Sequence, residues 1–318
     1  MTLPSPAIAC RCAAFALLLF TAGCARETKA SIAGTRAGWP PVLRYNIAVG
    51  TENPETQARR TGLVRDYLAG RLGIPVEITT VSNYGATIEA MRAKKVDAAS
   101  MGPFAYLIAS EKAGAEAIAT RGTGNDGRAG EYAGTLCVPA ASPFHSIDEV
   151  IRHAGELTIS FVDPASASGF LVERVYLDSR GVDPERDFRK VVFSNNHVFS
   201  AMTLVAGKAD VAAISENTLV TLHRSGKVAE GAVRVLWKSP PIPNAPIAVG
   251  RDLPATLKRQ LQDALIEMHD RAPEAFRSMF TATSNLASSS VFVRIDDSAF
   301  NGLRAMARGV KNVQLLEK

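Results

Sequence analysis

The sequence predicts an α/β fold made of two lobes. Segments that alternate apolar and polar residues, as β-strands do, take turns with segments whose apolar residues recur at helical spacing, about every ten to fifteen residues. This order is typical of βα units stacked on largely parallel sheets. Two proline-containing stretches, near 138–142 and at 238–246, divide the units into halves and predict two chain crossings, a hinge and a ligand cleft between the lobes.

The two crossings set the expected limits of the domains. Lobe 1 comprises 42–138 and 246–318, and lobe 2 comprises 139–245. The full chain has 318 residues, which is enough for two domains that each bury a core.

In the first lobe, a helix ends near residue 72, where Gly73 and Pro75 stop it. Further helices are expected at 84–93, 104–113, about 254–269, 272–280 and 296–308. Strands are expected at 43–49, 76–81, 96–100, 115–120, 132–138 and, on the return from the second lobe, 247–250. Several of these strands end in small or polar residues, which suits the carboxyl edge of a parallel sheet, where ligands bind.

In the second lobe the same rhythm continues. Strands are expected at 157–162, 188–193, 209–214 and 233–237, with helices at 147–151, 170–177, 196–207 and 216–225.

The junction at 163–171 is the most informative stretch of the second lobe. It links a strand to a helix through Asp-Pro-Ala-Ser-Ala-Ser-Gly-Phe-Leu, which is small and hydroxylated. The first amides of a helix have no intrahelical acceptor, and the helix dipole adds positive potential there. The junction therefore predicts an anion site at Ser166 and Ser168, although either serine could instead serve only as a helix cap.

The overall charge gives no sign of nucleic-acid binding. The net charge is +5, and the basic residues are scattered rather than clustered. Such a mildly positive field favours small anions. The five histidines lack the spacing of a metal site, and neither a cofactor nor a catalytic motif is expected.

The N-terminus predicts export. Residues 1–23 have the short apolar run and small-residue ending of a signal peptide, and Thr-Ala-Gly-Cys24 resembles a bacterial lipobox. Cys24 is then the lipidated residue and 24–41 a flexible tether to a membrane, although a plain secretory signal is the alternative. Only Cys137 remains in the body of the chain, so no intrachain disulfide is expected.

Six stretches in order resemble the phosphate, phosphite and phosphonate substrate-binding proteins of ABC importers, of the phosphonate-binding type. These stretches are 83–92 with Lys95-Val-Asp-Ala98, 102–106, 163–171, His197 at a helix start, 209–217, and Trp237-Lys-Ser-Pro-Pro-Ile-Pro243. The resemblance covers roughly 43–285. It implies a type II periplasmic-binding-protein fold, each lobe a mixed sheet flanked by helices, that closes over an oxyanion without catalysis.

The resemblance also implies site residues. Ser166 and Ser168, with the backbone around Ala167 and Gly169, are expected to hold the oxyanion, while Tyr84 and His197 close on it. Met101 and Gly102 are expected to line the other lobe, and Glu216 and Asn217 to face the non-oxygen substituent.

Four departures from the family pattern concern the ligand. Ala167 stands where the family has a threonine, Met101 where a tyrosine is common, Ser215-Glu-Asn217 where the family has Tyr-Glu-Asp, and Asn244-Ala245 where an aminophosphonate binder has a carboxylate. The last difference argues against recognition of an amino group.

The expected function is that of a monomeric, periplasmic, lipid-anchored binding protein that delivers a phosphonate, phosphite or phosphate to an ABC permease. The alternative is an accessory protein that reports the anion to a membrane sensor kinase.

Overall fold

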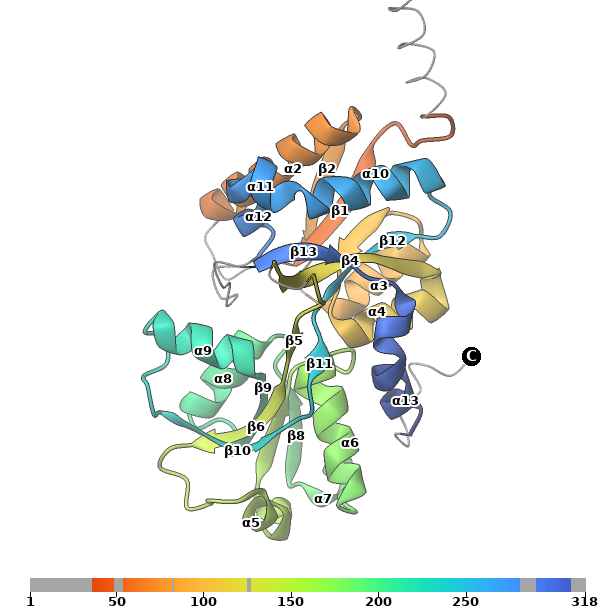
Figure 1. Cartoon of the computed structure of the whole chain (residues 1–318). Helices are drawn as coiled ribbons and strands as arrows, with labels where there is room; N and C mark the ends of the chain where they lie inside the picture. The colour runs from red at the N-terminus through yellow and green to blue at the C-terminus, as the bar shows by residue number, and fades with distance from the viewer. Residues whose placement is uncertain (1–35, 49–53, 82, 125–126, 281–289, 310–318) are drawn as a thin grey trace, which may run out of the picture. The chain divides into compact units, whose positions relative to one another are not determined.

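The computed structural model describes residues 36–48, 54–81, 83–124, 127–280 and 290–309 (Figure 1). The expected signal peptide, Cys24 and most of the expected tether lie outside these residues. The chain up to Trp39 is a unit of its own, so the account below concerns Pro40 onwards. None of the described helices has the length and apolar character that crossing a bilayer would need.

The first sheet is mixed and has six strands. These are β1 (Leu43–Ala48), β2 (Val76–Val81), β3 (Ala98–Ser100), β4 (Ala115–Thr123), β12 (Pro246–Gly250) and β13 (Ser290–Arg294), in the order β13-β4-β12-β3-β1-β2. β1 pairs in parallel with β2 and β3, whereas β12 and β13 pair antiparallel to their neighbours. The return of the chain to this sheet as β12 is confirmed.

Helices cover both faces of the first sheet (Figure 1). They are α2 (Pro54–Leu72), α3 (Tyr84–Arg92), α4 (Pro103–Ala113), α10 (Ala255–Ile266), α11 (Met268–Arg271), α12 (Pro273–Ser278) and α13 (Asn301–Gly309). The apolar side of α4 is fully buried, and its Phe104 and Leu107 join Phe300 and Leu303 in one core.

The second sheet is also mixed and has five strands. These are β6 (Gly134–Pro139), β7 (Thr158–Phe161), β8 (Lys190–Phe193), β9 (Val211–Ser215) and β10 (Val233–Lys238), in the order β10-β6-β9-β7-β8. The helical segments of this half are α5 (Ile147–Arg152), η2 (Ala167–Leu171), α6 (Val172–Ser179), α7 (Pro184–Asp187), α8 (His197–Val205) and α9 (Glu216–Arg224).

The chain passes between the sheets twice, and the two passages pair with each other. β5 (Glu131–Tyr132) and β11 (Ile242–Pro243) form a two-stranded antiparallel sheet. The first crossing therefore lies before the strand that the sequence assigned to lobe 1 at 132–138. β6 pairs with β9 and β10, so this strand belongs to the second sheet, and Pro139 ends β6 rather than marking the crossing.

Two aspartates of the family-like motifs align strands. Asp97, just before β3, accepts hydrogen bonds from the Arg44 backbone N–H (2.8 Å) and from Arg44 Nε (2.9 Å) at the start of β1. Asp210, just before β9, accepts one from the Thr158 N–H (2.7 Å) at the start of β7. In return, the Asp97 N–H donates to the Arg44 carbonyl, and the Asp210 N–H donates to the Thr158 carbonyl. These motif residues are structural in each half.

Candidate ligand-binding site

The junction after β7 becomes a tight turn followed by a wide helical turn. Asp163 accepts hydrogen bonds from the Ala165 N–H through its side chain and from the Ser166 N–H through its carbonyl, both at 2.8 Å. The helix then begins as the π-helical turn η2, in which the Leu171 N–H donates to the Ser166 carbonyl at 3.0 Å. The amides of residues 167–170 precede this first bond, so they are the donors that a helix start leaves to other acceptors.

The side chain of Ser166 does not cap the helix, and both Ser166 and Ser168 are buried. Both are about 1% exposed, and Ser166 occupies the N-cap position of η2 without a side-chain capping bond. Their hydroxyls instead meet aromatic side chains from other elements. The Tyr84 phenol at the start of α3 lies within interaction range of the Ser166 hydroxyl, and the Tyr132 phenol of β5 within range of the Ser168 hydroxyl. The alternative of a purely capping role is therefore excluded for Ser166.

His197 lies against the same turn in a defined tautomer. Its Nδ1 accepts the Ser215 N–H at 3.0 Å, and its Nε2 lies 3.4 Å from Ser168 Oγ. Because Nδ1 is occupied as an acceptor, the neutral ring carries its proton on Nε2, which faces Ser168. Burial lowers the pKa of His197 to about 4, so at neutral pH the ring is an uncharged donor.

Two glycines allow these groups to approach. A Cβ on Gly102 would lie 2.7 Å from the Tyr84 ring, and a Cβ on Gly169 would lie 2.4 Å from Val162 and 3.0 Å from His197. Gly102 thus packs closely against the Tyr84 ring. Its neighbour Met101 is 3% exposed and belongs to the core.

Glu216 and Asn217 border this cluster without joining its hydrogen bonds. The Glu216 N–H donates to the Ala133 carbonyl, and its carboxylate accepts from Lys238 Nζ at 2.6 Å. The backbone carbonyl of Asn217 accepts a hydrogen bond from the Thr221 hydroxyl. To face a ligand substituent, as expected, the Glu216 carboxylate would have to exchange or share its ion pair with Lys238.

Asn244, at the expected carboxylate position, has a structural role. It is 7% exposed, its Nδ2 donates to the Arg121 carbonyl at 3.0 Å, and its N–H donates to Gly130. These bonds join the second crossing to the end of β4.

The donors gathered at η2 are all uncharged. They comprise the amides of 167–170, two serine hydroxyls, the phenols of Tyr84 and Tyr132 and the His197 Nε2–H. Such donors suit an oxyanion with several oxygens, because each oxygen can accept two or more hydrogen bonds. Tyr132 was not among the sequence-predicted residues, since only the pairing of β5 with β11 carries it here.

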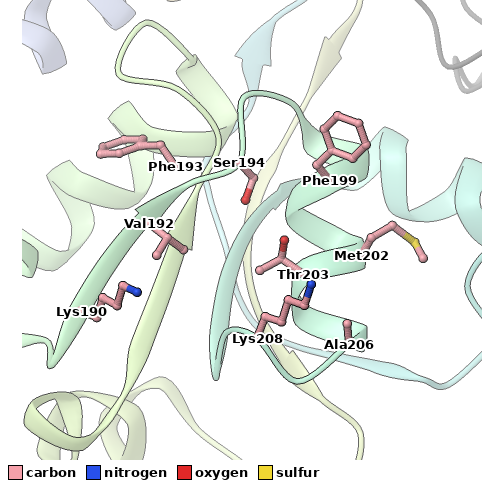
Figure 2. A pocket seen from close by; sticks show the side chains of 9 residues that line it. All are labelled: Lys190, Val192, Phe193, Ser194, Phe199, Met202, Thr203, Ala206 and Lys208. Atoms are coloured by element: carbon pink, nitrogen blue, oxygen red, sulfur yellow. The ribbon is translucent and has the colours of Figure 1, made fainter.

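A separate depression of about 640 Å³ lies between β8 and α8 (Figure 2). It is lined by Lys190, Val192, Phe193, Ser194, Phe199, Met202, Thr203, Ala206 and Lys208. None of the sequence-predicted ligand residues lines it. Phe193 and Phe199 are exposed there, at 43% and 56%.

The described residues contain no group of three or more His, Cys, Asp or Glu side chains that could hold a metal ion. The single free cysteine in this part of the chain, Cys137, is buried.

A family model for the periplasmic substrate-binding protein of phosphonate ABC transporters matches residues 47–300. The phosphonates-binding periplasmic protein of Escherichia coli (strain K12) is 29% identical over 232 residues, covering 73% of this chain and 67% of that protein. The phosphate-import protein PhnD of Mycolicibacterium smegmatis is 27% identical over 235 residues, covering 71% of each.

A solved structure supports the same grouping. A binding-protein component of an ABC phosphonate transporter from Pseudomonas aeruginosa matches with a TM-score of 0.71 and 26% identity, covering 84% of this chain and 85% of that one. The type II periplasmic-binding-protein fold that the resemblance implied is confirmed. The chain belongs to the family of periplasmic substrate-binding proteins of phosphonate ABC transporters.

Proposed function

We propose that this protein captures a small phosphorus oxyanion at the start of η2 and delivers it to the permease of an ABC importer. The oxyanion is a phosphonate, phosphite or phosphate. The observation that carries the proposal is the convergence of Ser166, Ser168, Tyr84, Tyr132 and His197 on one helix start.

The strength of such a site is adequate for transport. A hydrogen bond to a charged group contributes about 1.5–3 kcal/mol. Six or more donors supply more than the roughly 8 kcal/mol that micromolar affinity requires, even after desolvation of the anion. Because the donors are neutral, they favour an anion through hydrogen bonds rather than through ion pairs.

The similar proteins and Asn244 together favour a phosphonate or phosphate ligand without an amino group. The Escherichia coli and Mycolicibacterium smegmatis relatives are described as binding phosphonates and importing phosphate. Asn244 is held by backbone groups and carries no charge, so nothing at that position favours an amino substituent. We expect aminoethylphosphonate to bind more weakly than methylphosphonate.

Calorimetric titration of the chain without its first 23 residues tests this proposal. Phosphate, phosphite, methylphosphonate and aminoethylphosphonate are compared, and at least one is expected to bind with micromolar or tighter affinity. Absence of binding by all four would reject the ligand class.

The protein is proposed to act in the periplasm while anchored through a lipid on Cys24, which lies outside the described residues. The support is the lipobox-like Thr-Ala-Gly-Cys24 at the end of the signal-like segment. Replacing Cys24 by serine is expected to release the protein from membranes, and continued membrane association would reject the anchor.

A further inference from the structure

Glu173 is a buried carboxyl group that no other described residue hydrogen-bonds. It is 0% exposed, and in the described part of the chain neither of its side-chain oxygens has a hydrogen-bond partner in another residue. The next residue, Arg174, does not serve it, because its guanidinium is paired with Asp178 and Asp183. Burying a carboxyl group without hydrogen-bond partners costs free energy, so its presence here calls for a physical reason.

The carboxyl group lies directly behind the proposed anion site. Glu173 follows Gly169 by one helical turn, and its Oε1 packs against Gly134 at the start of β6. A Cβ on Gly134 would lie 2.2 Å from Glu173 Oε1 and 3.1 Å from the Ser168 Cα. The absence of a side chain at Gly134 therefore makes room for the carboxyl group beside the backbone of Ser168.

Among the residues that the structure describes, the titratable groups around Glu173 bring no positive charge to it. Tyr132 from β5 and Cys137 from β6 are close enough to interact with it, and both are neutral at physiological pH. β9 carries no titratable side chain. On α4 and α13, Tyr106 and Arg304 are both bonded to Asp297 instead.

The charge state of Glu173 therefore matters to an anion at η2. Burial raises the pKa of Glu173 well above its usual range, so the neutral form predominates in the folded protein. An ionised Glu173 would add a negative charge behind Ser168, at a site whose donors are uncharged and cannot offset it.

Building on the function proposed above, we propose that Glu173 makes anion capture proton-linked: the site holds a phosphorus oxyanion tightly only while Glu173 is neutral. In this linkage one carboxylate oxygen of Glu173 takes one proton from solvent, and no other bond is made or broken. Alkaline conditions ionise the group and weaken binding, whereas acidification restores it.

Titrations with methylphosphonate between pH 5.5 and pH 9 test this inference. The wild type is compared with Glu173→Gln, which keeps the shape of the side chain, and with Glu173→Met, which is apolar and similar in length. Glu156→Gln is the matched control, because Glu156 is an exposed carboxylate of the same half. Titration of the ligand and of His197 is common to all four proteins, so the ratio of their dissociation constants isolates Glu173.

The dissociation constants of wild type and Glu173→Gln are expected to agree at pH 5.5. By pH 9 the wild type is expected to bind at least about tenfold more weakly than either Glu173 variant, and the control to follow the wild type. Parallel curves for all four proteins would overturn the proton linkage while leaving the binding function intact. Failure of all four to bind would instead reject the proposed function.

Discussion

Neutral donors, rather than lysine or arginine side chains, make up the cluster at η2. Ser166, Ser168, Tyr84, Tyr132 and His197 can all donate without carrying a charge. The Ser215 N–H holds His197 Nδ1 as an acceptor, which keeps the ring neutral and points its proton toward Ser168. The proposed recognition of an anion therefore depends on how these N–H and O–H donors are oriented.

Alanine substitutions separate ligand binding from helix capping. Replacing Ser166 and Ser168 by alanine removes two donors, so we expect the dissociation constant for the bound oxyanion to rise at least about tenfold. Any loss in the free energy of unfolding should come from the buried hydroxyl contacts with Tyr84, Tyr132 and His197 and not from helix capping, because Ser166 makes no side-chain capping bond. Calorimetric titration and urea unfolding measure the two quantities.

Ser146→Ala provides the matched control for this pair. Ser146 caps α5 with a full capping box that includes Glu149, so its loss should cost about 1 kcal/mol of stability and leave affinity unchanged. A reversed pattern, with affinity unaffected at Ser166 and Ser168, would place the site elsewhere.

At the residue scale, the sequence predicted some members of the cluster at η2 and missed others. The small, hydroxylated junction after β7 pointed to Ser166 and Ser168 through local helix chemistry, and the motif resemblance added Tyr84 and His197. Tyr132 and Glu173 could not be found in this way. Their positions depend on the pairing of β5 with β11 and on the space left at Gly134, which are long-range features.

At the scale of elements, the two halves repeat one arrangement. In both sheets three parallel strands stand in the same order, β3-β1-β2 and β9-β7-β8, and a strand that has just crossed from the other half joins antiparallel, as β12 or β6. Tyr84 and His197 follow capping asparagines, Asn83 and Asn196, at equivalent helix starts. The repeat explains why both halves supply an aromatic or imidazole group to one site.

Asp97 and Asp210, which each hold the start of a neighbouring strand, belong to this repeat. We call them the aspartate clamps and expect their replacement to lower the stability of the fold. Asp97→Asn weakens charge-assisted bonds to Arg44 that align β1 with β3, so we expect a loss of about 2 kcal/mol in the free energy of unfolding. Oxyanion affinity should stay within twofold of the wild type, because Asp97 lies at the opposite ends of the strands from the site.

Asp66→Asn is the control for Asp97→Asn. Asp66 is 69% exposed and pairs with Arg65 at the surface of α2, where an ion pair contributes little. Equal losses of stability in the two variants would contradict the clamp.

Most elements were predictable from periodicity, and the failures have physical causes. α7 is a single turn that depends on the capping Asp183 and on Pro184, too short to show a helical period. β13 lies at the edge of the first sheet and was not predicted, although Val291, Phe292 and Val293 are residue types that favour strands. The boundary at 138 was misplaced because Pro139, the last residue of β6, and Pro143 after it resemble a linker.

At the scale of the whole molecule, the site depends on segments far apart in the chain. η2 contributes amides and hydroxyls, α3 and α8 contribute one ring each, and the β5–β11 passage contributes Tyr132. The same passage brings Gly134 against Glu173, so the crossing that joins the two halves also shapes the electrostatics behind the anion site.

The central claim is that the backbone amides at the start of η2 hold the oxyanion. Amide ¹H–¹⁵N chemical shifts recorded during titration with methylphosphonate test it most directly, because hydrogen bonding to an anion moves amide protons strongly downfield. The account predicts that the largest shifts fall on residues 167–170, with smaller ones at Tyr84 and His197. Largest shifts around Lys190 and Lys208, in the depression between β8 and α8, would contradict it.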